Sequence, residues 1–155
     1  MSTPASPVPV AASLATPDGA RGWQDAAKAA FLEARAALVA RFDAGEGIER
    51  LLGAQAAAVD AAVRAAWAAC LPADAQLDLL ATGGYGRGEQ YPFSDVDLLV
   101  LGEVEAQHAH EAGLGAFFAA LWDLGLKPGT AVRSLAECVQ ACREDVTTLT
   151  ALTEA

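Results

Sequence analysis

Basic residues are scarce in this sequence. Ten Lys and Arg residues stand against twenty Asp and Glu residues, which gives a formal net charge of -10. A surface of this sign repels the phosphate backbone of nucleic acids and the headgroups of anionic membranes. We therefore expect neither nucleic acid nor a membrane as a partner, and a substrate that carries phosphate needs a cation to accompany it.

Long uncharged apolar runs are also lacking, although 54% of the residues are hydrophobic. Charged residues interrupt the most apolar windows well before 18 residues, which excludes a membrane-spanning helix. The first basic residue is Arg21, and prolines break the apolar stretch before it, so no signal peptide is expected. These observations predict a cytoplasmic protein.

Cysteine and histidine are few and poorly placed for metal binding. The three cysteines, Cys70, Cys138 and Cys142, show no C-x-x-C spacing and cannot all pair with one another. His108 and His110 lie two residues apart in a polar stretch. This pattern excludes a disulfide framework and a zinc site, and it is typical of small buried thiols in a reducing compartment.

The first half of the chain divides into a tail and two helices. Residues 1–20 hold four of the seven prolines, which predicts a disordered tail. Residues 21–72 show apolar residues at spacings of three and four, interrupted by the sequence AGEG at residues 44–47. We therefore expect a helical hairpin over residues 21–72.

Residues 73–155 alternate between strand and helix patterns, which predicts an α+β core made of a sheet flanked by helices and preceded by the hairpin. Ser134 and Glu137 have the spacing of a helix-capping box. The final helical pattern has no closing cap, so we expect the core to continue beyond residue 155. The expected elements are a strand over residues 77–81, a buried strand over residues 96–101, a helix over residues 105–125, a weak strand over residues 130–133, and helices from residue 134 onward.

Four glycines within six residues, Gly83, Gly84, Gly86 and Gly88, follow the first expected strand. Glycines at such a place let backbone N–H groups approach a ligand, above all a phosphate. Their spacing does not match the dinucleotide-binding pattern G-x-G-x-x-G. The P-loop pattern also fails, because Glu89 stands where that loop needs a lysine. A glycine-rich turn without a ligand is the alternative interpretation.

Two aspartates, Asp95 and Asp97, stand at the start of the buried strand. Alternate residues of a strand point to the same side, about 6 to 7 Å apart. Two carboxylates so placed repel each other unless a cation lies between them, and Mg²⁺ or Mn²⁺ suits such hard oxygen ligands. The alternative is an exposed strand end whose acids have no function.

The glycine-rich turn of residues 83–88 and the pair of Asp95 and Asp97 together favour one kind of chemistry. A phosphate cradle followed closely by two carboxylates can hold a metal–triphosphate complex, with Arg87 as a local positive charge. That combination suits nucleotidyl transfer assisted by metal ions.

The stretch G-G-Y-G-R-G-E-Q-Y-P-F-S-D-V-D-L-L, residues 83–99, resembles the motif of nucleotidyltransferases of the DNA polymerase β type. Within them, the chain is similar to the N-terminal domain of the protein-PII uridylyltransferase and uridylyl-removing family. The segment LWDLGLKPGTAVRSLAECVQACREDVTTLTALTEA carries the same resemblance. The likeness covers residues 79–155 and implies a nucleotidyltransferase-type mixed sheet.

This resemblance assigns roles to six residues. It implies that Gly83 and Gly84 hold the β- and γ-phosphates of UTP, and that Arg87 braces the phosphate side. It further implies that Ser94 orients the loop, and that Asp95 and Asp97 are the catalytic pair and bind Mg²⁺. The implied reaction transfers UMP from UTP to a tyrosine of the PII signalling protein and releases pyrophosphate.

Two departures from the family pattern keep other functions open. The family supplies a third carboxylate from a later strand, whereas GTAVRSL, residues 129–135, carries no acid. The phosphohydrolase and glutamine-sensing domains of the family also fall outside these 155 residues. The alternatives are a related adenylyltransferase that acts on glutamine synthetase, or a non-catalytic nucleotide-binding regulatory fragment. Candidates for the third acid are Asp123, Glu137, Glu144 and Asp145.

Overall fold

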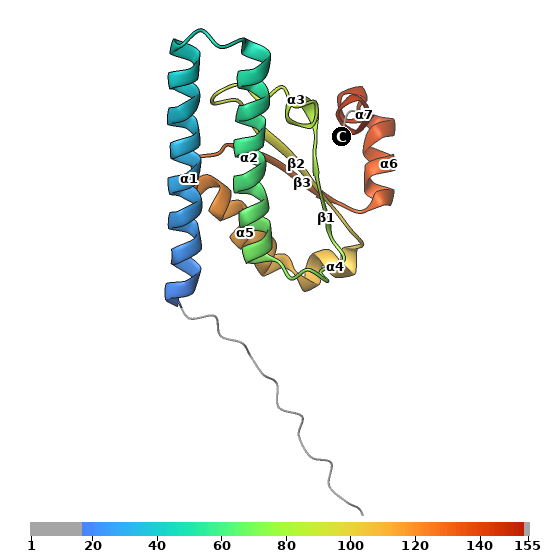
Figure 1. Ribbon diagram of the computed structural model, residues 1–155. Helices are drawn as coiled ribbons and strands as arrows, with labels where there is room; N and C mark the ends of the chain where they lie inside the picture. The colour runs from blue at the N-terminus through green and yellow to red at the C-terminus, as the bar shows by residue number, and fades with distance from the viewer. Residues whose placement is uncertain (1–16, 154–155) are drawn as a thin grey trace, which may run out of the picture.

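The computed structural model describes the backbone of residues 17–153 and the side chains of residues 22–153 (Figure 1). Most of the predicted tail, residues 1–16, lies outside the described residues. The structure corrects the end of that tail, because residues 17–20 already belong to a helix. The elements are α1 (Pro17–Asp43), α2 (Ile48–Cys70), β1 (Asp78–Ala81), α3 (Gly83–Gly86), β2 (Val96–Leu101), α4 (Val104–Ala109), α5 (Glu111–Asp123), β3 (Pro128–Arg133), α6 (Leu135–Glu144) and α7 (Val146–Thr153).

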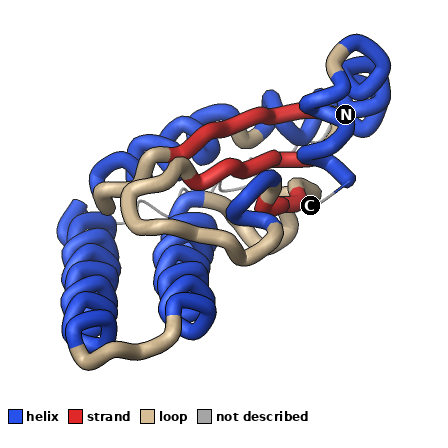
Figure 2. Tube along the Cα trace, turned by 90° about the horizontal axis from the view of Figure 1, so that it is seen from above, coloured by secondary structure: helices blue, strands red, loops and turns tan. Residues whose placement is uncertain are grey.

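Helices α1 and α2 form the expected hairpin and run side by side (Figures 1 and 2). A small cavity of about 180 Å³ lies where the two helices face each other, and alanines form most of its lining. The connection turns at Gly45, whose φ of 81° favours glycine. Arg41 closes it with two hydrogen bonds to the Glu46 carboxylate, of 2.6 and 2.8 Å. The end of the hairpin is therefore fixed by an ion pair.

The sheet has three strands in the order β1-β2-β3. Strand β1 pairs antiparallel with β2, and β3 pairs parallel with β2, so the sheet is mixed as expected. The parallel pair needs a crossover connection, which α4 and α5 supply. In the ladder, Asp97 of β2 stands opposite Gly129 of β3. This register matters for the site described below.

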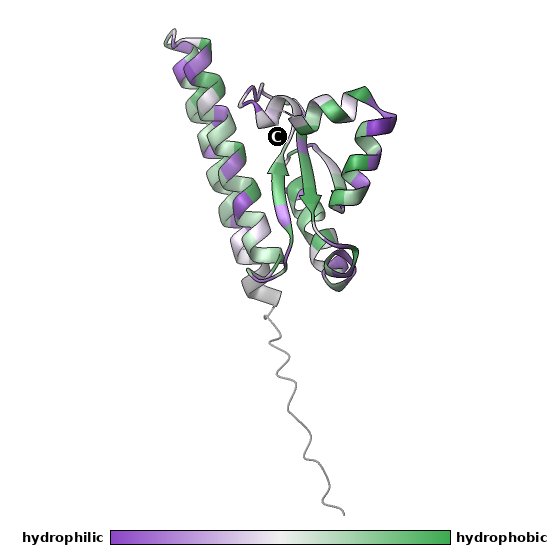
Figure 3. Ribbon diagram, turned by 90° about the vertical axis from the view of Figure 1, so that its right-hand side faces the viewer, coloured by the Kyte–Doolittle hydropathy of each residue, from purple (hydrophilic) through white to green (hydrophobic). Residues whose placement is uncertain are grey.

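The core lies between the sheet and the pair α2 and α5. Val96, Leu98 and Val100 of β2 are almost fully buried, and Phe117 of α5 packs in the same core. These strand residues alternate with Asp97, which therefore points to the opposite side of the sheet. The strands are predominantly apolar (Figure 3). Among the described residues, no helix combines the length and the apolar character needed to cross a membrane.

The prediction of one helix over residues 105–125 is wrong, because the segment forms two helices, α4 and α5. The chain leaves helical geometry at His110, where φ is -115° and ψ is 17°. After this break α5 packs tightly on the end of α2, where a Cβ atom on Gly113 would lie 2.8 Å from the carbonyl oxygen of Cys70. The close approach explains the glycine.

Helices α6 and α7 lie on the far side of the sheet from the hairpin (Figure 1). The capping box predicted from the sequence is present: Ser134 Oγ accepts from the Glu137 N–H, and the Glu137 carboxylate accepts from the Ser134 N–H. At the start of α7, the Asp145 carboxylate accepts from the N–H groups of Thr147 and Thr148. Both short helices therefore begin at side-chain caps.

Candidate functional site

The glycine-rich stretch is a single helical turn, α3, rather than an open loop. Gly83 enters it with a φ of 58°, in the left-handed region that favours glycine. The N–H groups of Gly86 and Arg87 donate to the carbonyls of Thr82 and Gly83. Within the described part of the chain, the N–H groups of Gly83 and Gly84 have no acceptor. Two backbone donors at the head of the turn are thus open to a ligand.

The carboxylate of Asp97 lies between two glycines. A Cβ atom on Gly83 would lie 3.1 Å from Oδ2 of Asp97, and a Cβ atom on Gly129 would lie 2.5 Å from Oδ1. The second distance is far below normal contact, so a side chain at residue 129 would force the carboxylate to move. The structure therefore brings Asp97 directly against the glycine turn, on the side of the sheet away from the hairpin.

Asp95 and Ser94 belong to the loop that leads into β2. Asp95 immediately precedes the strand and is exposed, while Val96 after it is buried. Ser94 closes the turn of residues 91–94, because its N–H and its Oγ both donate to the carbonyl of Tyr91, at 3.2 and 2.8 Å. The turn fixes the backbone just before the first aspartate.

Arg87 ends the glycine turn and lies beside Gly84. A Cβ atom on Gly84 would be 3.8 Å from a terminal guanidinium nitrogen of Arg87. The same side chain forms an exposed ion pair of 3.0 Å with Glu89. A positive charge therefore stands at the glycine turn, partly balanced by a neighbouring acid.

A third acid does not join the pair in this structure. Within residues 17–153, no three His, Cys, Asp or Glu side chains gather where they could hold a metal ion. Glu137 and Asp145 cap helices, and Glu144 accepts a hydrogen bond from Gln140. Their capping bonds hold the pKa values of Glu137 and Asp145 below the usual range. Asp123, at the end of α5, is exposed.

The donors that are present nevertheless fit Mg²⁺ or Mn²⁺. Magnesium in nucleotide-binding sites is held by one or two carboxylates together with the phosphates of the substrate. Asp97 supplies one carboxylate in a slot that glycines keep free of other side chains, and Asp95 supplies a second, exposed one.

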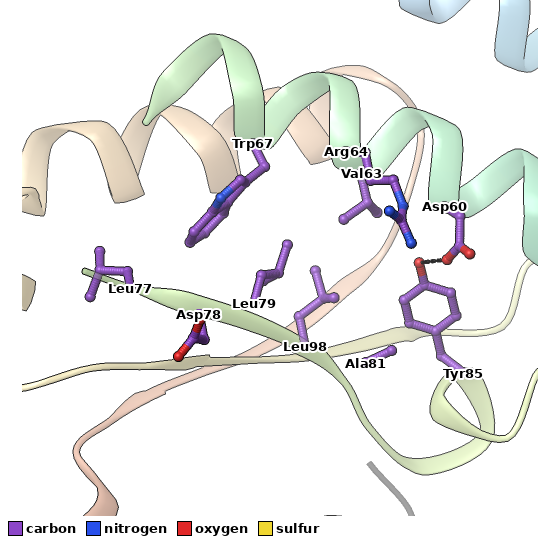
Figure 4. A pocket seen from close by; sticks show the side chains of 10 residues that line it. All are labelled: Asp60, Val63, Arg64, Trp67, Leu77, Asp78, Leu79, Ala81, Tyr85 and Leu98. Carbon is purple, nitrogen blue, oxygen red and sulfur yellow. Dashed lines mark hydrogen bonds between the residues drawn. The ribbon is translucent and has the colours of Figure 1, made fainter. Parts of the chain in front are cut away.

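Tyr85 ties the glycine turn to the hairpin on the other side of the sheet (Figure 4). Its ring is buried, and its hydroxyl donates a hydrogen bond to Oδ1 of Asp60 on α2. Burial, and then this bond, raises the pKa of the Tyr85 phenol far above its ordinary value. The two residues line a cavity of about 390 Å³ between α2 and β1, together with Arg64. The turn is therefore anchored on one side while it presents Gly83 on the other.

Sequence reasoning missed Gly129 and the pair of Tyr85 and Asp60. The role of Gly129 could have been suspected from the sequence, because an isolated glycine beside a strand pattern often marks the close approach of another group. The sequence does not indicate the role of Asp60, because this residue is 25 positions from Tyr85 and resembles any other polar residue of a helix. Only the folded chain brings these two residues together.

Fold and site together define an α+β domain that presents a glycine turn and an aspartate on the central strand of a mixed sheet. The model of the nucleotidyltransferase domain family matches residues 69–146, and the chain belongs to that family. No solved structure matches the chain significantly.

Several curated proteins are similar to most of this chain. A protein of Xanthomonas campestris pv. campestris (strain B100) is 54% identical over 136 residues, which is 88% of this chain and 16% of the relative. A protein of Stutzerimonas stutzeri (strain A1501) is 44% identical over 128 residues, or 82% of this chain and 14% of the relative. Both are named bifunctional uridylyltransferase/uridylyl-removing enzyme. The chain thus spans about one sixth of the length of the curated relatives it matches.

Proposed function

We propose that this chain is a metal-dependent nucleotidyltransferase domain that transfers UMP from UTP to a tyrosine of the PII nitrogen-regulatory protein. The observation that carries the proposal is the position of the Asp97 carboxylate, against Gly83 and its open backbone N–H group. Support for uridylyl transfer comes from the names of the relatives. The reaction is placed in the cytoplasm, where nucleoside triphosphates are available.

Each residue of the site has a task in this proposal. The N–H groups of Gly83 and Gly84 bind the terminal phosphates of UTP, and Arg87 adds a charge-assisted hydrogen bond on the same side. Ser94 keeps the loop of residues 91–94 in its turn, so that Asp95 and Asp97 hold Mg²⁺. When bound, the metal stabilises the negative charge that develops on the transferring and departing phosphates.

Bonds and charges balance in the proposed transfer. The tyrosine oxygen of the acceptor attacks the α-phosphorus of UTP, and the bond from that phosphorus to the bridging oxygen breaks. Pyrophosphate leaves with the electron pair of that bond, and the phenolic proton passes to solvent water. Asp95, immediately before β2, is exposed and therefore open to the solvent from which the acceptor approaches.

Calorimetry with Mg²⁺ and UTP tests the binding half of this proposal. The unaltered chain is expected to bind Mg–UTP more tightly than Mg–ATP, and Asp97→Asn is expected to remove binding while the chain stays folded. Asp43→Asn serves as the matched control, since Asp43 is an exposed acid at the end of α1, on the hairpin. Preference for ATP would favour the related adenylyltransferase that acts on glutamine synthetase. Equal binding by Asp97→Asn would overturn the site.

A second candidate is a regulatory module that binds the nucleotide without transferring it. It is favoured by one observation, the lack of a third acid beside Asp95 and Asp97 in the described chain. Incubation with PII, labelled UTP and Mg²⁺ or Mn²⁺ separates the two. Label on PII supports the transferase, and binding of UTP without label under either metal supports the module.

A further inference from the structure

Gln90 is a buried polar residue that the site described above does not use. Only 2% of its surface is exposed, and it lies between the glycine turn and the loop that leads to Asp95. Its side-chain Nε2 donates to the carbonyl oxygens of Ser94 and Asp95, at 3.3 and 3.4 Å. One carboxamide therefore bridges two consecutive backbone carbonyls next to the proposed metal ligand.

The orientation of this carboxamide is determined by its partners. If Oε1 and Nε2 were exchanged, an oxygen would face two carbonyl oxygens and both bonds would be lost. In the present orientation, Oε1 is buried without a hydrogen-bond partner among the described residues. Gln90 lines a small cavity of about 30 Å³, which is enough space for one water. A buried amide oxygen without a partner is costly, and the cavity beside Gln90 is where a water could supply one.

The turn that directly precedes the backbone bridged by Gln90 is strained. Phe93 has a φ of 67°, in the left-handed region that non-glycine residues avoid. It follows Pro92 in the turn of residues 91–94, at the place where this kind of turn normally has glycine or asparagine. Such strain persists only when the surroundings hold it. Here the guanidinium of Arg35 on α1 lies 4.3 Å from the centre of the Phe93 ring, Ser94 closes the turn on the Tyr91 carbonyl, and Gln90 holds the two carbonyls that follow Phe93.

We propose that Gln90 is the positioning residue of the metal-binding loop. By holding the carbonyls of Ser94 and Asp95, it fixes the peptide planes on both sides of Asp95 and so the direction in which that carboxylate leaves the chain. The inference rests on the proposed function, because it takes Asp95 as a metal ligand. Gln90 touches neither metal nor nucleotide and acts through the backbone.

The test compares Gln90→Met with Gln55→Met in the full chain. Methionine keeps the length and volume of glutamine but cannot donate to the loop. Gln55 is also buried and lines the same cavity, yet it forms no hydrogen bond to the loop within the described structure, so it is a matched control. Binding of Mn²⁺ with UTP is followed by electron paramagnetic resonance, and folding by thermal melting.

Gln90→Met is expected to weaken Mn²⁺ binding about tenfold or more, as is typical when a group that orients a metal ligand is removed. Gln55→Met is expected to bind like the unaltered chain. Unchanged binding by Gln90→Met, or an equal loss in both variants, would overturn this inference alone. No Mn²⁺ binding by the unaltered chain would overturn the proposed function and this inference with it.

A second measurement needs no variant and decides the matter if Gln90→Met does not fold. In nuclear magnetic resonance spectra of the unaltered chain, Mg²⁺ and UTP are added together. The side-chain amide signals of Gln90 are expected to shift in step with the backbone amide of Asp95. Gln90 signals that stay in place while the Asp95 amide shifts would contradict the positioning role.

Discussion

Gly129 stands beside Asp97 in the parallel ladder of β2 and β3, and the space of its missing side chain is where the Asp97 carboxylate lies. The two residues are 32 positions apart in the sequence, and the pairing of β2 with β3 brings them together. Gly83 borders the same carboxylate from the glycine turn. Asp97 is thus held in a narrow slot, and its direction depends on two residues that carry no chemistry of their own.

Gly129→Ala is the most direct test of this slot. Its Cβ atom would lie 2.5 Å from Oδ1 of Asp97, so the carboxylate has to rotate away from its present place. We expect the affinity for Mg–UTP to fall clearly, while the melting temperature changes little because residue 129 is exposed. Calorimetric titration and thermal melting measure the two effects.

Gly115→Ala is the control for that change. Gly115 lies in α5, and a Cβ atom there meets nothing within 4 Å. Alanine in an exposed helix position is expected to stabilise the fold by roughly 0.5–1 kcal/mol, with nucleotide binding unchanged. If both glycine variants bind Mg–UTP equally well, the slot does not position Asp97.

Tyr85→Phe tests the bond between the glycine turn and the hairpin. The change removes the hydroxyl that donates to Asp60 and keeps the buried ring. A hydrogen bond to a charged acceptor is worth about 1.5 kcal/mol or more when it is shielded from water, so we expect a loss of stability of that order. Urea unfolding measures it. The same loss in a chain that already carries Asp60→Ala would show that the two residues are not coupled.

Stability at high pH depends on the same tyrosine. Burial and the Asp60 carboxylate raise the pKa of Tyr85, so the folded chain keeps the phenol neutral after the unfolded chain has begun to ionise. This contribution is complete below a pH of about 10, the ordinary tyrosine pKa, and is lost as the pH rises above it. We expect the free energy of unfolding to fall above pH 10, and to fall less steeply in Tyr85→Phe. Parallel slopes for the two chains would contradict the assignment.

Ser134→Ala tests the capping box of α6. The change removes the Oγ that accepts from the Glu137 N–H. Loss of such a cap costs roughly 1 kcal/mol, and since Ser134 is buried, water does not replace it easily. Chemical denaturation measures the effect. Ser134→Thr, which can still cap, is expected to retain most of the stability.

Much of the fold could be predicted because the signals are local. The hairpin followed from apolar spacing, β2 from the run VDLLVL, and the cap of α6 from Ser134 and Glu137. The break at His110 could not be predicted, since residues 105–125 continue a helical pattern and only packing against the end of α2 distinguishes two helices from one.

The sequence by itself determined the chemistry available to this protein. The backbone N–H groups of a glycine run can bind phosphate, and two aspartate carboxylates can bind a metal ion, because these properties belong to the residue types. Tertiary structure decided how they are aimed. Gly129, Tyr85 with Asp60, and Gln90 act through sheet pairing, burial and hydrogen bonds between distant residues, and such contacts exist only once the chain has folded.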